Sequence, residues 1–153
     1  MEWVYDRTQA DVERVKGLND KYAAGTISEE EKMEWAAGMK GALNVADLNR
    51  IESNIREIAE TLAVSVTVKT WGANQIPRVS DFKRICDNVQ RIREAWSALK
   101  DTPATPDPPL TTYQKWNAIE RILHDVKYVY DRVMGSYYYC GDEIYAGEGI
   151  GIL

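Results

Sequence analysis

Residues 45–58 read VADLNRIESNIREI, and residues 79–92 read VSDFKRICDNVQRI. With an offset of 34 residues the two stretches are identical at six of their fourteen positions. A further shift of 34 aligns the NRIE of residues 49–52 with the NAIE of residues 117–120. In all three places apolar residues recur at intervals of three and four, which is the pattern of one face of a helix. The sequence therefore predicts three related helices that pack their apolar stripes into one bundle rather than a solenoid.

Start and stop signals place the helices along the chain. Ser28 and Glu31 have the spacing of a capping box, and Gly135 follows the last apolar stripe. We expect two N-terminal helices that form a hairpin over residues 8–40, followed by a repeat core over residues 44–134. The three long helices of this core are expected at about 45–63, 80–100 and 112–134. The whole chain, residues 1–153, is predicted to be a single, mainly α-helical domain.

A small β element is also expected. Residues 64–69 alternate β-branched and polar side chains, which is typical of a strand. Residues 137–146 are predicted to form a hairpin that turns at Gly141 and Asp142 and joins the first strand in one sheet. Residues 136–153 would then be a β tail available for docking. The segment 101–109 contains four of the five prolines and is predicted to be a semi-rigid linker.

The polar residues that recur in the repeat have a structural explanation. Asp47 and its counterpart 34 residues later fall in the first helical turn, where a carboxylate faces the positive end of the helix. Arg50 follows three residues on, which is the distance for an ion pair on one face. Asn54 directly precedes an apolar stripe residue, so we expect it at the edge of the core, bonded to a neighbouring loop. These residues predict a fold rather than a ligand site.

Charge and composition exclude several function classes. The net charge of −5 and the pI near 5.0 argue against nucleic acid as a partner. No apolar run is long enough for membrane insertion, and the N-terminus lacks the pattern of a signal peptide. Cys86 and Cys140 lack the spacing of metal ligands and are expected to be reduced thiols, with a disulfide between them as the alternative. His124, the only histidine, is expected at the surface or at the edge of a helix. No catalytic, cofactor-binding or metal-binding residue is predicted, and we do not expect an enzyme.

The aromatic residues offer the clearest functional hint. The chain has nine Tyr and five Trp but one Phe. One interpretation is that these rings are half-buried at the edges of layers, and another is that they form a surface for docking a protein or stacking on sugar rings. The residues expected at such an interface are Trp71, Tyr137, Tyr138, Tyr139 and Tyr145.

Several ordered stretches resemble a known module. These stretches are DRTQADV at 6–12, WAAGMKGALN at 35–44, DLNRIE at 47–52, KTWGANQIP at 69–77, NAIE at 117–120 and YCGDEIYAGE at 139–148. Together they are similar to a module in tail-associated structural proteins of phages and prophages of Gram-positive (Firmicutes) gut bacteria. The resemblance implies a non-enzymatic virion protein of a phage tail, baseplate or fibre, made in the cytoplasm of the bacterial host. It also implies contacts with other phage tail and baseplate proteins and assembly as a homo-oligomer, and it supplies no catalytic residues.

Two alternatives come from other classes of protein. A carbohydrate-binding module for host-surface glycans would use Trp71 and the tyrosines as a stacking platform. Exposed coplanar aromatics beside Asn, Asp or Gln would favour it, and aromatics buried between helices would argue against it. A small glycosidase or peptidase would need two facing carboxylates in a cleft, and the sequence indicates no such pair.

Overall fold

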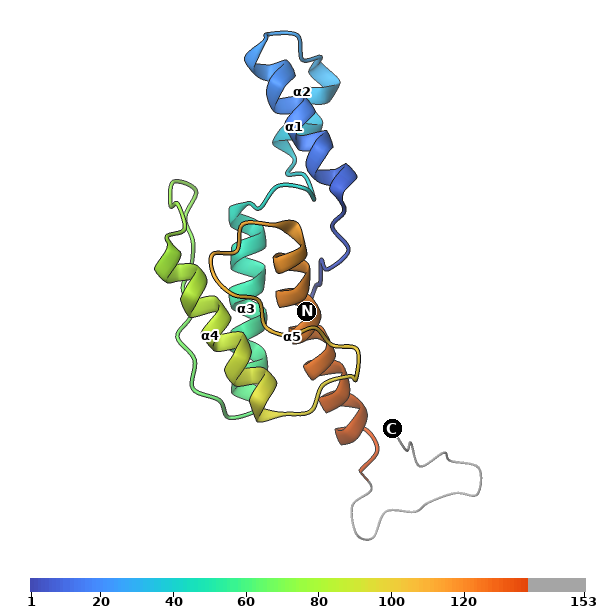
Figure 1. Cartoon of the computed structure of the whole chain (residues 1–153), viewed down its shortest axis with the longest axis vertical. Coiled ribbons are helices and arrows are strands. Elements are labelled where there is room, and N and C mark those ends of the chain that lie inside the picture. The colour runs from blue at the N-terminus through green and yellow to red at the C-terminus, as the bar shows by residue number, and fades with distance from the viewer. Residues whose placement is uncertain (138–153) are drawn as a thin grey trace, which may run out of the picture.

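The computed structural model describes residues 1–137, which form five helices and no strand. The helices are α1 (Gln9–Ala23), α2 (Glu29–Ala36), α3 (Val45–Thr61), α4 (Val79–Ala95) and α5 (Tyr113–Met134) (Figure 1). The last three begin at residues 45, 79 and 113, so the offset of 34 in the sequence is the spacing of the helix starts. The predicted class, a mainly α-helical bundle, is confirmed. None of these helices has both the length and the apolar character needed to cross a membrane.

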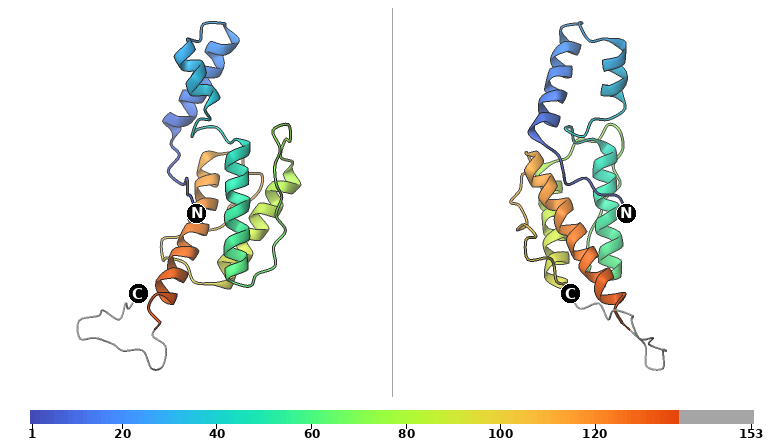
Figure 2. Two further views of the ribbon diagram at one scale, coloured as in Figure 1. Left: turned by 180° about the vertical axis from the view of Figure 1, so that it is seen from behind. Right: turned by 90° about the vertical axis from the view of Figure 1, so that its right-hand side faces the viewer.

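The long helices α3, α4 and α5 pack on one another around a single core (Figures 1 and 2). The predicted stripes supply this core, because each helix buries its apolar residues at intervals of three and four. The completely buried aliphatic side chains of the three stripes include Ile51, Ile55 and Ile58, Ile85, Val89 and Ile92, and Ile119, Leu123 and Val126.

Helices α1 and α2 form a hairpin that projects beyond one end of the bundle (Figure 2). Leu18 is the only buried residue of the two helices. Arg14 and Glu34 join them by an ion pair of 2.7 Å between exposed side chains. With so little apolar burial, the hairpin is an arm attached to the bundle rather than part of its core.

Helix α4 ends earlier than predicted, whereas α2 ends within the range expected for the hairpin. Helix α4 ends at Ala95 instead of about residue 100, because Trp96 adopts an extended backbone conformation and packs edge to face against Tyr130 with ring centroids 5.3 Å apart. Helix α2 ends at Ala36, and Gly38 follows with a φ of 90°, in the left-handed region that favours glycine.

The predicted strand at residues 64–69 is wrong as secondary structure, although its alternation is correct. Val64, Val66 and Val68 pack against the core, whereas Ser65 and Thr67 are exposed. The segment is extended but pairs with helix side chains instead of another strand, so no ladder of backbone hydrogen bonds forms. The rest of the expected sheet, residues 138–146, lies outside the described residues.

Candidate docking site

Two helices hold an extended segment by its backbone. On α3, the Asn49 side chain accepts from the Trp71 N–H at 2.8 Å and donates to the Trp71 carbonyl at 3.0 Å. Three residues along the same helix, Glu52 accepts from the Lys69 N–H at 3.3 Å and from the Trp71 indole N–H at 3.2 Å. These bonds satisfy polar groups that would otherwise be buried without partners.

Helix α5 repeats the arrangement with a different segment. Asn117 accepts from the Arg7 N–H at 3.2 Å and donates to the Arg7 carbonyl at 2.8 Å. Glu120 accepts from the Val4 N–H at 2.9 Å. The Asn-x-x-Glu pattern shared by the two helices is therefore a clamp for an extended backbone, here residues 4–7.

The other repeated asparagines complete the clamps, as the sequence predicts for residues at the edge of the core. Asn54 donates to the Glu2 carbonyl at 2.9 Å. Asn88 donates to the Thr67 carbonyl at 2.7 Å and accepts from its N–H at 3.4 Å. Each asparagine binds backbone atoms of a connecting segment, which fixes that segment along the bundle.

The proline-rich connection between α4 and α5 is held by other contacts. Helix α4 has Lys83 and Cys86 where the other helices have Asn and Glu. The proline-rich connection needs fewer acceptors, because proline has no backbone N–H. Its carbonyl groups are bonded instead, since Lys115 Nζ lies 2.7 Å from the Asp107 oxygen and the Trp116 indole donates to Leu110 at 3.0 Å.

A buried charge network ties the N-terminal segment to the bundle. Glu120 is completely buried and bonds Arg7 at 3.0 Å and Arg50 at 2.8 Å. Arg50 also pairs with Asp47 at 2.8 Å, which confirms the predicted ion pair three residues apart. Burial lowers the pKa of Arg50, but the bonds to Glu120 and Asp47 outweigh it and raise the pKa overall. The network keeps these buried charges paired.

In the second copy of the repeat, the arginine has a different main partner. Arg84 lies 3.9 Å from Asp81, so the predicted pair is present but long. Arg84 instead donates to Glu52, with Nη1 2.9 Å from Oε2. The hydrogen bond to Glu52 is the main reason that the pKa of Arg84 is raised. Arg84 therefore links α4 to α3.

Asp125 forms a second buried polar cluster. It accepts from the Thr102 hydroxyl at 2.7 Å and from Arg121 at 2.8 Å, and His124 Nδ1 lies 2.8 Å from its other oxygen. Burial raises the pKa of Asp125, but the three hydrogen bonds together lower it below its ordinary value. The cluster holds Thr102, near the start of the connection between α4 and α5, against α5.

We expect Asp125 to make folding sensitive to acid. Because its pKa is lower in the folded chain than in the unfolded chain, its stabilising contribution is complete above about pH 5. It starts to fall near the ordinary Asp pKa of about 3.9 and is lost as the pH falls through the lowered folded value. Urea unfolding at a series of pH values should show a shallower decline between about pH 5 and 2.5 for Asp125→Asn than for the wild type. Equal slopes would contradict this role.

His124 lies at the edge of α5, as the sequence predicts. Its ring is partly buried between Trp3 and Tyr5, with centroid distances of 5.7 Å and 5.1 Å. These contacts help to hold the N-terminal segment against the helix.

The aromatic residues expected at an interface differ in their exposure to solvent. Trp71 is 3% exposed and lies in the core, so its ring is not available for stacking on a sugar or a partner. Tyr137 is 67% exposed. Tyr138, Tyr139 and Tyr145 lie outside the described residues. The sequence could not reveal the burial of Trp71, because that burial depends on the Glu52 carboxylate, which accepts its indole proton.

Only one of the two cysteines lies in the described part of the chain. Cys86 is a free thiol in the core, and burial is the main reason that its pKa is raised to about 11. This thiol is therefore protonated and shielded at neutral pH. Cys140 lies outside the described residues.

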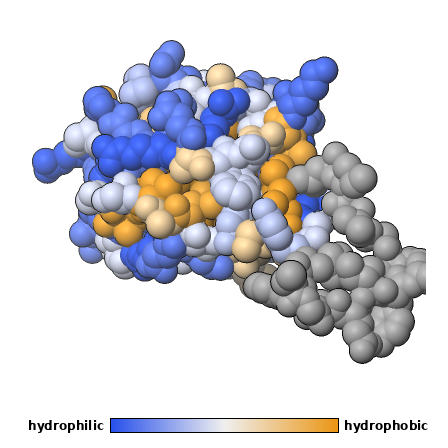
Figure 3. All heavy atoms as spheres, turned by 90° about the horizontal axis from the view of Figure 1, so that it is seen from below, coloured by the Kyte–Doolittle hydropathy of each residue, from blue (hydrophilic) through white to orange (hydrophobic). Residues whose placement is uncertain are grey.

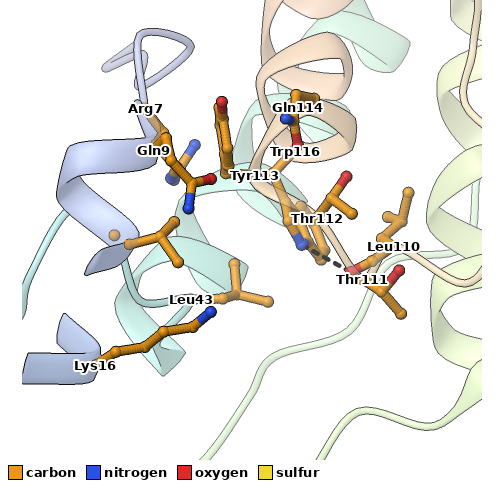
Figure 4. A pocket seen from close by; sticks show the side chains of 12 residues that line it. Arg7, Gln9, Lys16, Leu43, Leu110, Thr111, Thr112, Tyr113, Gln114 and Trp116 are labelled. Carbon is orange, nitrogen blue, oxygen red and sulfur yellow. Dashed lines mark hydrogen bonds between the residues drawn. The ribbon is translucent and has the colours of Figure 1, made fainter. Parts of the chain in front are cut away.

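A pocket of about 440 Å³ opens where the hairpin meets the bundle (Figure 4). Side chains from α1, from the linker before α3 and from the start of α5 converge on it. Its lining contains two cations and no acidic residue. The lining residues are Arg7, Gln9, Val12, Lys16, Gly41, Leu43, Leu110, Thr111, Thr112, Tyr113, Gln114 and Trp116.

The hairpin also carries exposed apolar side chains. Tyr22 and Trp35 stack on each other with centroids 5.1 Å apart, and both rings remain partly open to solvent. Met33, on the same hairpin, is 68% exposed. Their positions on helices were predictable from the sequence, but their exposure was not, because it arises from the shortness of α2, which leaves them without a covering element.

Apolar side chains also gather at the opposite end of the bundle (Figure 3). Met134 is exposed at the last turn of α5, near the end of the described chain. The protein thus presents apolar surface at both of its ends.

Comparisons with known proteins add no family to this description. The chain matches no protein-family model, no curated protein and no solved structure in these comparisons. Within residues 1–137, no group of three or more His, Cys, Asp or Glu side chains is arranged to hold a metal ion. The fold and the candidate site define a three-helix bundle with clamped connections and a projecting helical arm.

Proposed function

We propose that this chain is a non-enzymatic structural protein of a phage tail, baseplate or fibre, and that it works through contacts with other tail or baseplate proteins. The sequence resemblance supplies the setting of this proposal. The observation that carries the docking role is the projecting hairpin with its exposed Tyr22, Met33 and Trp35. In the virion, copies of the chain would assemble symmetrically, as subunits of most protein assemblies do.

The distribution of apolar surface supports this proposal. The bundle itself buries its stripes and covers α3 and α5 with its own clamped segments, so those helix faces are already occupied. The hairpin exposes two aromatic rings and a methionine together, on an arm that reaches away from the bundle. Tyr, Trp and Met are enriched in the cores of protein interfaces, where they contribute much of the binding energy.

The buried carboxylates described above support a structural role as well. Glu52, Glu120 and Asp125 are each bonded to an arginine and to a segment outside the helices. Through these bonds the three carboxylates stabilise the fold. The burial of Trp71 in the core argues against the carbohydrate-binding alternative, which needs this ring exposed for stacking on a sugar.

Purified virions provide the direct test. We expect mass spectrometry to detect the chain in particles of a phage that encodes it, and crosslinking to join the hairpin to another tail or baseplate protein. Absence of the chain from purified virions would refute the virion proposal.

A substitution on the hairpin tests the docking role separately. Met33→Glu is expected to reduce incorporation into virions about tenfold, since an interface residue of this kind contributes about 1–2 kcal/mol. Met33 is 68% exposed, so the change should leave folding intact. Ile76→Glu is the matched control, because Ile76 is 85% exposed in a loop of the bundle. Equal incorporation of the two variants would show that the hairpin is not the docking element.

A further inference from the structure

The pocket between the hairpin and the bundle has donors that no side chain or backbone group of residues 1–137 accepts from. Lys16 extends from α1 toward Leu43 and the start of α5 (Figure 4). Within residues 1–137 its ammonium group makes no ion pair, although Glu13 and Asp20 lie three and four residues away on the same helix. The side chains of Tyr113 and Gln114 on the opposite wall likewise make no hydrogen bond within the described chain. These three side chains from two elements therefore face one cavity with donors to offer.

The charge of the pocket contrasts with that of the protein. The chain has 24 acidic residues and a net charge of −5, yet no acidic residue lines this pocket. The other lining cation, Arg7, is already bonded to Glu120 and Asp47, which leaves Lys16 as the cation available to a ligand. The pocket is therefore complementary to a negative group in an otherwise acidic molecule.

The size and the apolar part of the lining limit the class of ligand. A volume of about 440 Å³ lies in the range of binding pockets. Leu43, Leu110 and Trp116 contribute apolar surface beside the donors. This combination suits a carboxylate next to an aliphatic side chain, as in a short peptide with Asp or Glu beside Leu or Ile.

We propose that this pocket binds the carboxylate side chain of an acidic and apolar peptide segment of a partner protein, with Lys16 as its ionic contact. The inference rests on the proposed docking function and names the chemistry of the partner. It adds a second contact at the base of the arm, where a bound peptide would touch both the hairpin and the bundle. Such a peptide would then fix the angle of the arm.

The test uses the peptide N-acetyl-Leu-Glu-Leu-amide and the full-length chain. In ¹H–¹⁵N NMR titrations we expect saturable shifts of the Trp116 indole N–H and of the Gln114 amide. The corresponding peptide with Gln in place of Glu should shift them less, because it lacks the charge. Lys16→Ala is expected to weaken binding of the Glu peptide by up to about fivefold, the range of an exposed ion pair.

Lys100→Ala is the matched control, since Lys100 is exposed in the connection that follows α4. Its binding should equal that of the wild type. Three outcomes would overturn the proposal: no saturable shift with the Glu peptide, equal shifts with the Gln peptide, or equal weakening by both lysine variants. None of these would remove the chain from virions, so failure of the pocket and failure of the virion role are distinguishable.

Discussion

Glu120→Ala is expected to lower the free energy of unfolding by about 3–5 kcal/mol. Glu120 is completely buried and accepts from Arg7, Arg50 and the Val4 N–H. Removal of the carboxylate leaves a buried arginine poorly compensated, because Arg7 keeps only the longer contact to Asp47, at 3.3 Å, and its bond to the Val4 carbonyl. Urea unfolding followed by circular dichroism measures the loss.

Two further variants separate charge from shape at this position. Glu120→Gln keeps the volume of the side chain but loses its charge. We therefore expect its free energy of unfolding to lie between that of the wild type and that of the alanine variant. Glu57→Ala, at an exposed position of α3, should change stability by no more than about 0.5 kcal/mol. If Glu120→Ala were as mild as Glu57→Ala, the network would not hold the N-terminal segment in place.

Gly41→Ala is expected to destabilise the joint between the hairpin and the bundle by about 1–3 kcal/mol. A Cβ at Gly41 would lie 2.1 Å from the Asp11 carbonyl oxygen and 2.7 Å from the Val12 nitrogen. Both are backbone atoms, so α1 must move away from the linker. Amide hydrogen exchange in α1 measures the effect, because it reports local opening of the arm.

Gly17 provides the matched control for this substitution. It lies within α1, and a Cβ there would meet no atom within 4 Å. Gly17→Ala should therefore stabilise α1 by about 0.5–1 kcal/mol, since alanine favours a helix more than glycine does. The two Gly→Ala changes are thus expected to shift amide protection in opposite directions. A shift of the same sign would mean that the close approach of the linker does not constrain the arm.

The repeat in the sequence predicted the bundle because helix periodicity is local information. The stripes around Ile51 and Ile85 depend on residues three and four apart, and the caps depend on residues three apart. The pairing of Asp47 with Arg50 was predictable for the same reason. The N-terminal hairpin followed from its capping box at Ser28.

The strand prediction failed because the identity of a backbone partner is not local information. The alternation at residues 64–69 correctly indicated one apolar face, but the pattern is the same whether the neighbour is a strand or the side of a helix. The partners are Asn88 and Glu52, which lie 21 and 17 residues from the groups that they bind. The early end of α4 at Ala95 was missed because Trp96 turns to meet Tyr130 on another helix.

The candidate site was less predictable than the fold. Trp71 was expected at a surface because indole rings are common at interfaces, but the Glu52 carboxylate allows it to be buried. The pocket joins residues of α1 with residues about 100 positions later in the sequence, among them Lys16 and Gln114. Only the fold, which places α1 across the pocket from the start of α5, brings them together.

The clamps also affect how this protein can change over evolutionary time. Asn49 and Asn117 bond only main-chain atoms of these segments, and Glu52 and Glu120 each bond one main-chain N–H, a group that every non-proline residue supplies in the same form. Substitution of outward-facing side chains of the clamped segments, such as that of Thr67, is therefore expected to change stability little. Mutation can alter these outward positions, and with them the surface that the protein offers to its neighbours, while the helices beneath keep their sequence.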